Sequence, residues 1–566
     1  MKRHCLLFSL NSKFTQSNLA IHYLKSYSEK HLKDWNFETL ELSINLPLAT
    51  LQAELMERVS DVLAVSCYIW NIEIVRKLLS NLRQLRPDIS IILGGHEVSF
   101  DPQTYLKANE CDYVISGEGE EKFRSLLASF DQKADFPQID GLSYLKDGQV
   151  VQTPANSEVK ELDQIPSPFL EGSPLLEQDF VYYEASRGCV YKCHFCLSAL
   201  DRGTRFFSLD RFESDMEVLL SRDNLKQIKF VDRTFNLNVK RSNFIFEYLI
   251  KNGGKRNFHF EIQAELFKKS TLDILKKAPD GLFQFEIGVQ SWHQAVLDKN
   301  GRQCRLEKLE QNLRTLLEET KVHIHLDLIA GLNGESPQQF KHSFNRVFDF
   351  KPHHLQVETL KILKGSLSLR YNSTNGYVYQ QSPPYSLLKS PDWSYSELRE
   401  VEEIGAILEV FYNRDPLHES TLFLLDKFPS PFEFFSLFNS FLKSQGQSYT
   451  GIALKRSYEL LHEFARTNDL LSCEFLEVLS IDYLKRFPHG GKTPWHKPST
   501  TLPSGEFREI AAKQGWNRKG FLEVLSKGTF FYFTGKPENL CFDITNEVSN
   551  DVSERILKNV SVPSVS

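Results

Sequence analysis

Short apolar segments alternate with stretches of helical periodicity along the first 130 residues. Five segments have strand character, at residues 5–10, 37–44, 62–67, 89–93 and 113–116. Between the third and the fourth, residues 72–85 carry apolar side chains at helical spacing. Such alternation is typical of a doubly wound parallel sheet, which binds ligands at the carboxyl ends of its strands. We therefore predict an α/β domain of this class over residues 1–130.

The pattern changes over residues 131–175. Residues 141–144 and 150–153 alternate in strand fashion around Asp147-Gly148, a dipeptide that favours a hairpin turn. The following segment contains Pro166 and Pro168, which favour extended backbone. We predict a linker with one hairpin here.

From residue 180 the alternation of strand and helix restarts. Six further segments have strand character, at residues 180–184, 228–232, 258–263, 283–288, 323–328 and 355–359. Six repeats predict a partial (β/α)6 barrel over residues 176–368, with the active site on the loops at the carboxyl ends of its strands. The repeats stop after that point, and residues 369–566 predict a mainly helical C-terminal domain.

Length and composition narrow the function classes. A chain of 566 residues exceeds what one hydrophobic core supports, and 41% hydrophobic residues suffice for several cores. The net charge of −6 argues against a surface built for nucleic acid. No apolar stretch approaches the length of a membrane span, so we expect a cytoplasmic protein without membrane contact. A reducing compartment also suits the odd number of nine cysteines.

Three of the cysteines, Cys189, Cys193 and Cys196, form a CxxxCxxC loop directly after the first barrel strand. Three thiolates at this spacing can hold three irons of a [4Fe-4S] cluster and leave the fourth iron open to another ligand. A zinc site completed by His194, or a group of buried thiols, is the alternative. Zinc sites use CxxC pairs and a separated second pair of ligands, and the sequence has no such pair.

With Phe195 just before its last cysteine, this loop resembles the cluster loop of radical S-adenosylmethionine (SAM) enzymes. The resemblance implies that SAM chelates the open iron through its amino and carboxylate groups, and that one electron cleaves it to a 5′-deoxyadenosyl radical. It also implies an electron donor such as a flavodoxin or ferredoxin. Arg187 and Lys192 flank the cysteines and could balance the cluster's negative charge, or they could be exposed loop cations.

The resemblance also places contacts to SAM near the ends of the barrel strands. The predicted SAM-binding residues are Phe195, Asp232, Thr234, Gln263, Glu286 and Ile329. A carboxylate at position 232 could accept from the SAM ammonium, and one at 286 could accept from ribose hydroxyls. The alternative is a polar network inside the barrel that contacts no ligand. No further catalytic residue is predicted.

Glycine-bearing turns follow two strands of the first domain, at Gly94-Gly95-His96-Glu97 and Gly117-Glu118-Gly119-Glu120. These turns on a flavodoxin-like sheet resemble the cobalamin-binding domain that precedes many radical SAM cores. The predicted cobalamin contacts are Asn11, Thr15, Ser66, Tyr68, Gly94, Gly95, Gly117 and Glu118. The DxHxxG signature is absent after the first strand, so cobalamin should bind without a histidine beneath cobalt. A domain that binds nothing is the alternative.

The chain is thus similar to cobalamin-dependent radical SAM proteins that carry an uncharacterised C-terminal extension. The leading prediction is methyl transfer to an unactivated carbon or phosphorus of a small-molecule or natural-product-like substrate. Radical cyclisation, oxidation and methylthiolation remain alternatives, and a non-catalytic corrinoid or redox sensor is an alternative of another class. Methylthiolation would need a second cluster, for which only Cys5, Cys67 and Cys111 precede the loop. Burial as inert thiols is expected for the six other cysteines: Cys5, Cys67, Cys111, Cys304, Cys473 and Cys541.

Overall fold

The computed structural model describes residues 2–487 apart from residues 60, 133–135, 201–202, 373–374, 415–416 and 450. The chain divides into two compact units. The first comprises Met1–Phe340 with Thr359–Leu398, and the second comprises Lys341–Glu358 with Arg399–Ser566. The predicted boundaries after residues 130, 175 and 368 stay predictions, and the helical prediction for residues 488–566 lies outside the described residues.

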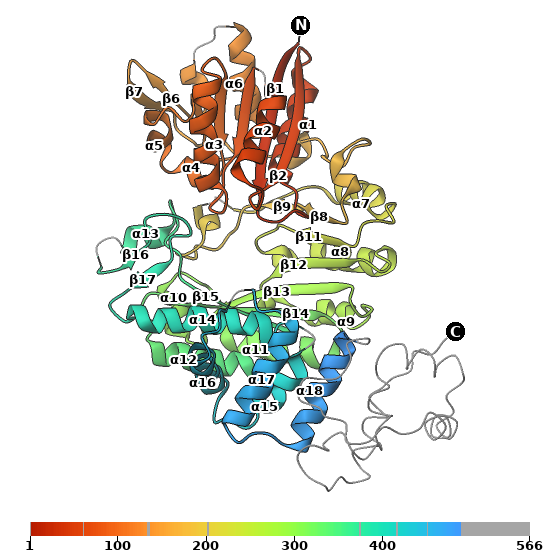
Figure 1. Ribbon diagram of the computed structural model, residues 1–566. Helices are drawn as coiled ribbons and strands as arrows, with labels where there is room; N and C mark the ends of the chain where they lie inside the picture. Colours follow the sequence, from red (N-terminus) through yellow and green to blue (C-terminus); the bar gives the residue numbers. More distant parts are fainter. Residues whose placement is uncertain are drawn as a thin grey trace, which may run out of the picture. The chain divides into compact units, whose positions relative to one another are not determined.

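The first unit begins with a seven-stranded sheet in the order β2-β1-β3-β4-β5-β6-β7 (Figure 1). Its strands are β1 (Arg3–Asn11), β2 (Trp35–Ser43), β3 (Val62–Ser66), β4 (Ser90–Gly94), β5 (Tyr113–Ile115), β6 (Leu142–Lys146) and β7 (Gln149–Gln152). The first five are parallel, and their order 2-1-3-4-5 is that of flavodoxin. The predicted flavodoxin-like fold is therefore confirmed.

The predicted hairpin is the antiparallel pair β6 and β7. Its turn residues Asp147 and Gly148 both have positive φ angles, 51° and 75°. Two consecutive positive angles define the turn type that matches the twist of a two-residue hairpin, and Asp-Gly adopts it readily. The sequence pattern therefore located this element correctly.

Helices cover both faces of the N-terminal sheet (Figure 1). One apolar core joins the sheet to α2 (Leu48–Arg58), α3 (Ile72–Leu85) and α5 (Pro102–Lys107), and a second joins its other face to α1 (Leu19–His31) and α6 (Glu120–Gln132). The α3 helix forms as predicted, and its apolar residues Ile72, Val75, Leu78, Leu79 and Leu82, at spacings of three and four, are buried. A four-residue helix, α4 (His96–Ser99), follows β4.

The second sheet of this unit is parallel and runs in the order β14-β13-β12-β11-β8. Its strands are β8 (Phe180–Tyr183), β11 (Gln227–Phe230), β12 (Asn257–Ile262), β13 (Phe283–Gln290) and β14 (His323–Ala330), and the sixth predicted strand is β15 (His354–Thr359). The intervening helices are α7 (Leu209–Leu220), α8 (Val239–Asn252), α9 (Lys269–Leu275), α10 (Gln294–Lys299), α11 (Leu306–Glu319) and α12 (Pro337–Phe348). This agrees with the predicted β/α repeat.

The two faces of this second sheet differ in chemistry. On the helix side, Phe260, Phe283 and Phe285 interlock with Phe246 of α8. On the other side, alternate residues of β12, β13 and β14 are polar and often titratable. A parallel sheet buried on both faces normally has apolar residues throughout. The polar face therefore marks the inside of the barrel as a place for bound groups.

The first unit also contains α13 (Leu367–Asn372), β16 (Val378–Tyr379) and β17 (Leu387–Lys389). The second unit is helical, with α14 (Tyr395–Phe411), α15 (His418–Leu425), α16 (Pro431–Ser444), α17 (Leu454–Thr467) and α18 (Cys473–Arg486). Its core is aromatic, with Phe434, Phe438 and Phe464 in mutual contact. None of the helices within the described ranges is long and apolar enough to cross a membrane.

Candidate active site

The three predicted cluster cysteines lie on one loop whose ends are held together by a short ladder. β9 (Ser186–Arg187) pairs antiparallel with β10 (Arg205–Phe206), and the loop between them follows the end of β8. Cys189 and Cys193 are buried and Cys196 is half-buried, with all three thiols free of disulfides. The amide of Cys196 donates to the carbonyl of Cys193 at 3.1 Å, so the last two cysteines stand one tight turn apart.

This donor set suits an iron–sulfur cluster better than a single ion. Cysteine thiolates are the ligands that hold such clusters. Within residues 2–487, apart from the gaps given above, no three His, Cys, Asp or Glu side chains converge on a point where one metal ion could sit. In a cubane cluster each thiolate binds its own iron. The ring of His194, the fourth ligand in the zinc alternative, stacks on Tyr371 instead.

An arginine that the sequence pattern did not reveal lies beside the cysteine loop. Nη1 of Arg302 is 4.0 Å from Sγ of Cys193, and Nη2 donates to the carbonyl of Gly288. The neighbouring Gly301 has φ +67°, and a Cβ there would lie 2.4 Å from the carbonyl oxygen of Lys192. The segment after β13 is therefore fitted closely against the loop and brings one guanidinium to a cluster ligand.

The two cations predicted to balance the cluster have other contacts. Nζ of Lys192 donates to the carbonyl of Ala199 at 2.8 Å. The guanidinium of Arg187 donates to Glu184 and Glu120. Arg302 is the cation that the structure places next to a cysteine sulfur, and its distance along the chain from the cysteines explains why spacing alone could not predict it.

Asp232, predicted to bind SAM, is only 2% exposed and bonds to the segment that leads into the cysteine loop. Its carboxylate accepts from the amide of Ala185 at 3.0 Å and from the hydroxyl of Ser186. Burial raises its pKa to about 6, although these hydrogen bonds oppose the shift. In this structure Asp232 therefore positions the start of the loop, and a contact with SAM stays a prediction.

Gln263 is likewise held by the protein. Its backbone bonds to Asn236 in both directions, and its side chain donates to Glu265 and to the carbonyl of Gln303. The structure thus places Gln263 at the carboxyl end of β12 with its amide group occupied. Its predicted contact with SAM also remains a prediction.

Three other predicted SAM residues lie near the strand ends without such networks. The hydroxyl of Thr234 is 3.7 Å from Sγ of Cys189, so the structure brings these two together. Phe195 is half-buried on the loop itself. Ile329 is half-buried on the polar face of β14. Their placement is compatible with the predicted site.

Glu286 belongs to a polar cluster inside the barrel. Its Oε2 lies 2.9 Å from Nε2 of His259 and accepts from Nζ of Lys229 at 3.1 Å. Burial alone would raise its pKa, but these two partners outweigh burial and lower it. The carboxylate is therefore ionised and paired across three neighbouring strands, as in the predicted alternative of an interior network.

Two other carboxylates on the polar face have fewer partners. Glu261 lies opposite Glu286 in the strand register, and Asp327 lies two residues further toward the barrel mouth. Glu261 has Arg233 as its nearest cation, at 3.9 Å. Burial raises the pKa of Glu261 to about 7. Burial also raises the pKa of Asp327, although His325 lies 3.0 Å away and favours the ionised form. Glu261 can therefore exchange a proton near neutral pH at the place where the barrel fold binds its ligands.

The carboxyl edge of the N-terminal sheet is also polar, at the switch point between β1 and β3 where this fold binds ligands. Asn18 donates to the hydroxyls of Ser9 and Ser66 at 2.7 and 3.1 Å, and Asn11 donates to Glu41 at 2.7 Å. The structure therefore brings the predicted contacts Asn11 and Ser66 together in one network. Thr15 is exposed on the turn after β1.

Two of the three glycines predicted to make room for cobalamin are required by the backbone and packing of the protein itself. Gly95 has φ +109°, and a Cβ there would lie 2.3 Å from the carbonyl oxygen of Cys67. Gly117 has φ +80°, and a Cβ would meet Nζ of Lys122 at 2.9 Å. Only Gly94 has room, since the nearest atom to a Cβ would be the Ile115 carbonyl oxygen at 3.8 Å. The packing of the protein therefore gives no reason for a glycine at position 94.

Arg233 connects the barrel mouth with the N-terminal sheet. Burial raises the pKa of Tyr68 and lowers that of His96, and the charge of Arg233 acts on both. Nζ of Lys364, which follows β15, lies 2.9 Å from Glu97 in the same turn. The mouth of the barrel and the carboxyl edge of the sheet thus face each other within the first unit.

The remaining described cysteines do not form a second cluster site. Cys5 belongs to the apolar core on one face of the N-terminal sheet, whereas Cys67 and Cys111 belong to the core on the other face. Cys304 is also buried. The side chain of Cys473 and all of Cys541 lie outside the described residues. The triad that methylthiolation would need is therefore not assembled.

Comparison with protein families identifies three parts of the chain. Residues 7–127 match the B12-binding domain, and residues 183–347 match the radical SAM superfamily. Residues 373–527 match a family described as proteins of unknown function, DUF4080. The predicted combination of a B12-binding domain, a radical SAM domain and an uncharacterised C-terminal extension is confirmed.

Two curated relatives are methyltransferases by name. The chain is 27% identical over 326 residues to the cobalamin-dependent radical SAM methyltransferase TokK of Streptomyces tokunonensis, covering 54% of this chain and 47% of TokK. It is 24% identical over 377 residues to 2-(S-pantetheinyl)-carbapenam-3-carboxylate methyltransferase of Streptantibioticus cattleyicolor, covering 61% of this chain and 53% of that protein. The chain thus spans about half the length of these relatives.

Among solved structures, the chain resembles the cobalamin-dependent SAM radical enzyme OxsB with aqua-cobalamin and SAM bound. The TM-score is 0.59 at 17% identity, over 94% of this chain and 84% of OxsB. A match at this identity establishes the fold and nothing finer. The arrangement of a B12-binding sheet followed by a radical SAM barrel is therefore shared.

Proposed function

We propose that this chain, which carries a B12-binding domain and a radical SAM domain, is a cobalamin-dependent radical SAM methyltransferase. The proposal is carried by the presence of both domains in one chain, together with a contact between them: Nζ of Lys364, after the last barrel strand, lies 2.9 Å from Glu97 in the turn after β4. This contact brings the loop after the last barrel strand to the turn that contains the predicted cobalamin contacts Gly94 and Gly95. A reaction that uses both cofactors on one substrate requires this proximity.

In this proposal Cys189, Cys193 and Cys196 hold the cluster, and the polar edge near Asn11 and Ser66 faces the cobalamin. When bound, the cluster supplies the electron that cleaves SAM, and the cobalamin supplies a transferable methyl group. The chain's own residues orient these groups and exclude water.

Glu261 and Asp327 are the residues that could hold or move a proton beside the substrate. Both have a pKa raised by burial, and both lie on the polar face of the barrel near its mouth. We place the substrate between these carboxylates and the N-terminal sheet. We propose a small molecule, since the relative from Streptantibioticus is named for a carbapenam substrate. The acceptor is an unactivated carbon or phosphorus, and a flavodoxin or ferredoxin is the proposed electron source.

Reductive cleavage of SAM tests the radical half of the proposal. The full chain is reconstituted with iron and sulfide without oxygen, reduced with dithionite, and assayed for 5′-deoxyadenosine. We expect about four irons per chain and formation of 5′-deoxyadenosine. The matched variants are Cys193→Ala in the loop and Cys111→Ala in the apolar core. Equal product from wild type and Cys193→Ala would refute the radical half.

A separate experiment tests whether the protein binds cobalamin. Wild-type protein is reconstituted with hydroxocobalamin and desalted, and its visible spectrum is recorded. A stoichiometric corrinoid spectrum supports the proposal. A desalted protein without corrinoid bands would reduce the N-terminal domain to a scaffold and remove methyl transfer from cobalamin as the proposed reaction.

A further inference from the structure

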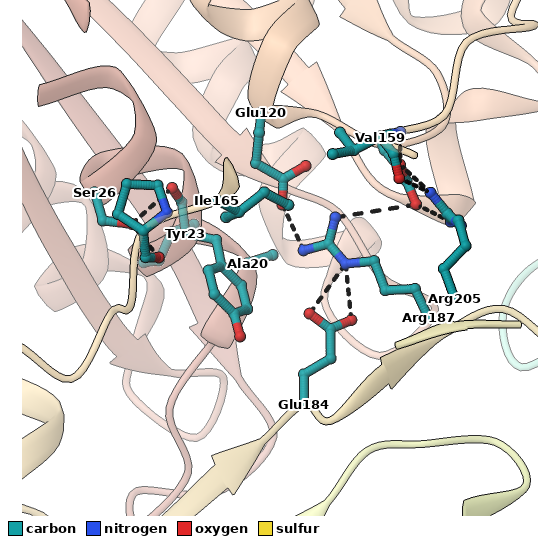
Figure 2. A network of polar contacts seen from close by, with 12 residues as sticks. Ala20, Tyr23, Ser26, Glu120, Val159, Ile165, Glu184, Arg187 and Arg205 are labelled. Atoms are coloured by element: carbon teal, nitrogen blue, oxygen red, sulfur yellow. Dashed lines mark hydrogen bonds and ion pairs between the residues drawn. The ribbon is translucent and has the colours of Figure 1, made fainter. Parts of the chain in front are cut away.

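The stem of the cysteine loop carries one arginine on each strand. Arg187 on β9 and Arg205 on β10 are direct partners in the antiparallel ladder, so their side chains lie next to each other. Both reach away from the barrel toward the turn that follows β5 of the B12-binding domain (Figure 2). The base of the loop is therefore in contact with a different domain from the one that contains it.

Glutamates of that turn bind the two arginines. Arg205 makes two contacts with the carboxylate of Glu118, one at 3.1 Å and one shorter. Nη2 of Arg187 donates to Glu120 at 2.6 Å, and Nη1 lies 4.0 Å from Glu118. Glu118 also accepts from the amide of Val159 at 2.7 Å, which ties the linker into the same network. Both oxygens of Glu118 are thus engaged by the protein.

Most of the network is buried, although Glu118 and Arg205 are 19% and 21% exposed. The side chain of Arg187 is 12% exposed and that of Glu120 is 6% exposed. On its other side, Nε of Arg187 donates to both oxygens of Glu184 at 3.0 Å, and its guanidinium lies over the ring of Tyr23, 5.4 Å from the ring centre (Figure 2). Removing one member of such a buried group leaves a charge without its partner, which is much more costly than losing a surface ion pair.

We propose that Arg187 and Arg205, with Glu118 and Glu120, form a stem clamp by which the B12-binding domain holds the cysteine loop in the shape that retains its cluster. Arg187 and Arg205 are positioning residues, because they act on the cluster through the backbone of the loop. Glu118 lies about 70 residues from the cysteines in the sequence and in another domain. It then stabilises the loop that binds the cluster. The clamp rests on the proposed function only in that the three cysteines hold a cluster.

Iron retention tests the clamp without SAM or corrinoid. The reconstituted full chain is exposed to a ferrous chelator under anaerobic conditions, and the rate of iron release is measured. We expect Glu118→Gln to release iron about tenfold faster than wild type, because the loop base opens more often. Glu118→Asp keeps the carboxylate and should restore most of the retention. The EPR spectrum of the reduced cluster should change in Glu118→Gln and return in Glu118→Asp.

The matched control is Glu110→Gln. Glu110 accepts from Arg76 through two nitrogens at 2.8 and 3.0 Å within the same domain, and neither residue belongs to the stem clamp. Its substitution should lower stability without faster iron release. Wild-type retention in Glu118→Gln would overturn the proposal, and so would equally fast release in Glu110→Gln, since that indicates general destabilisation.

A second variant covers the case in which Glu118→Gln does not fold. Arg205→Lys keeps the charge and loses the forked contact with Glu118, so we expect release about threefold faster than wild type. Unchanged release would again overturn the clamp. Hydrogen exchange of residues 185–207 in the unloaded chain gives an independent readout, with faster exchange expected in each clamp variant. Because no SAM or corrinoid is present, the result stands whether or not the protein transfers methyl groups.

Discussion

The barrel mouth and the carboxyl edge of the N-terminal sheet both collect polar groups at the ends of parallel strands, but they differ in what those groups contact. At the sheet edge, Asn18, Ser9 and Ser66 bond to one another, and Gly95 is required by the backbone of Cys67. At the barrel mouth, three thiols form no disulfide, and Glu261 has only a distant ion pair among its described contacts. The protein's own fold accounts for the first set and not for the second.

This difference shows where the evidence for a ligand is strongest. Residues that the fold itself requires can be present whether or not a ligand binds. A buried carboxylate without a close partner is costly to the fold, so its presence points to a bound group. A buried thiol is not costly in itself, but three thiols at a cluster spacing on one loop have no packing reason to occur together. The cysteine loop is therefore stronger evidence for a bound group than the glycine turns are.

The largest expected effect is loss of the cluster in Cys193→Ala. Two thiolates cannot hold three irons, so iron should fall from about four per chain to below about one, and 5′-deoxyadenosine should fall to background. Iron analysis and product quantification after anaerobic reconstitution check this. Cys111→Ala removes a buried thiol from the apolar core of the N-terminal domain, and this variant should keep its iron. Retained iron in Cys193→Ala would contradict the assignment of the loop.

Substitution of the two adjacent glycines separates structural from ligand roles at the sheet edge. Gly95→Ala should destabilise the fold by about 3 kcal/mol, because its φ of 109° and ψ of 166° suit only glycine and its Cβ would clash with Cys67. Gly94→Ala should cost about 1 kcal/mol or less, since its Cβ has room. Urea denaturation measures both.

The same Gly94→Ala variant then reports on cobalamin. If corrinoid approaches the backbone there, its affinity should fall about tenfold while stability is nearly unchanged. Equilibrium titration with hydroxocobalamin checks this. Unchanged affinity would mean that none of these glycines makes room for cobalamin. The sheet edge would then differ even more from the barrel mouth as evidence for a ligand.

Arg302→Gln should make the cluster harder to reduce. Removing a positive charge 4.0 Å from Cys193 favours the more oxidised, less negative cluster, so we expect the midpoint potential to fall by on the order of 50 mV. Potentiometric titration followed by EPR measures the shift. Arg314→Gln, in a surface pair with Glu310, is the matched control and should leave the potential unchanged. A potential unaffected by Arg302→Gln would show that this cation does not tune the cluster.

The smallest effect concerns pH and Glu261. Burial raises the pKa of this carboxyl in the folded protein to about 7, above its value of about 4.3 when unfolded. The folded state therefore binds the proton more tightly, and stability from this group is complete below about pH 4 and is lost as pH rises through 7. The free energy of unfolding should fall between pH 6 and 8, and Glu261→Gln should make that fall smaller by about 1 kcal/mol. Denaturation curves at both pH values check this, and an unchanged pH dependence would contradict it.

Most of the fold could be predicted because its signals are local. The strands and the α3 helix follow from alternation and spacing within a few residues, and the hairpin follows from Asp147-Gly148. The strand order and the pairing of the domains depend on contacts between distant residues. The roles of Asp232 and Arg302 could not be predicted for the same reason, since Asp232 has a choice of partners and Arg302 lies more than 100 residues from the thiol it meets.

The sequence by itself determined the chemistry of the protein: three thiols at a cluster spacing, two kinds of β/α repeat and a set of residues at strand ends. Only the tertiary structure decided which of those residues are free to meet a ligand. Asp232, Gln263 and Glu118 are engaged by the protein, whereas the cysteines and Glu261 are much less so. The physical reason is that a residue's type fixes what it can bond, and its place in the fold fixes what is within reach.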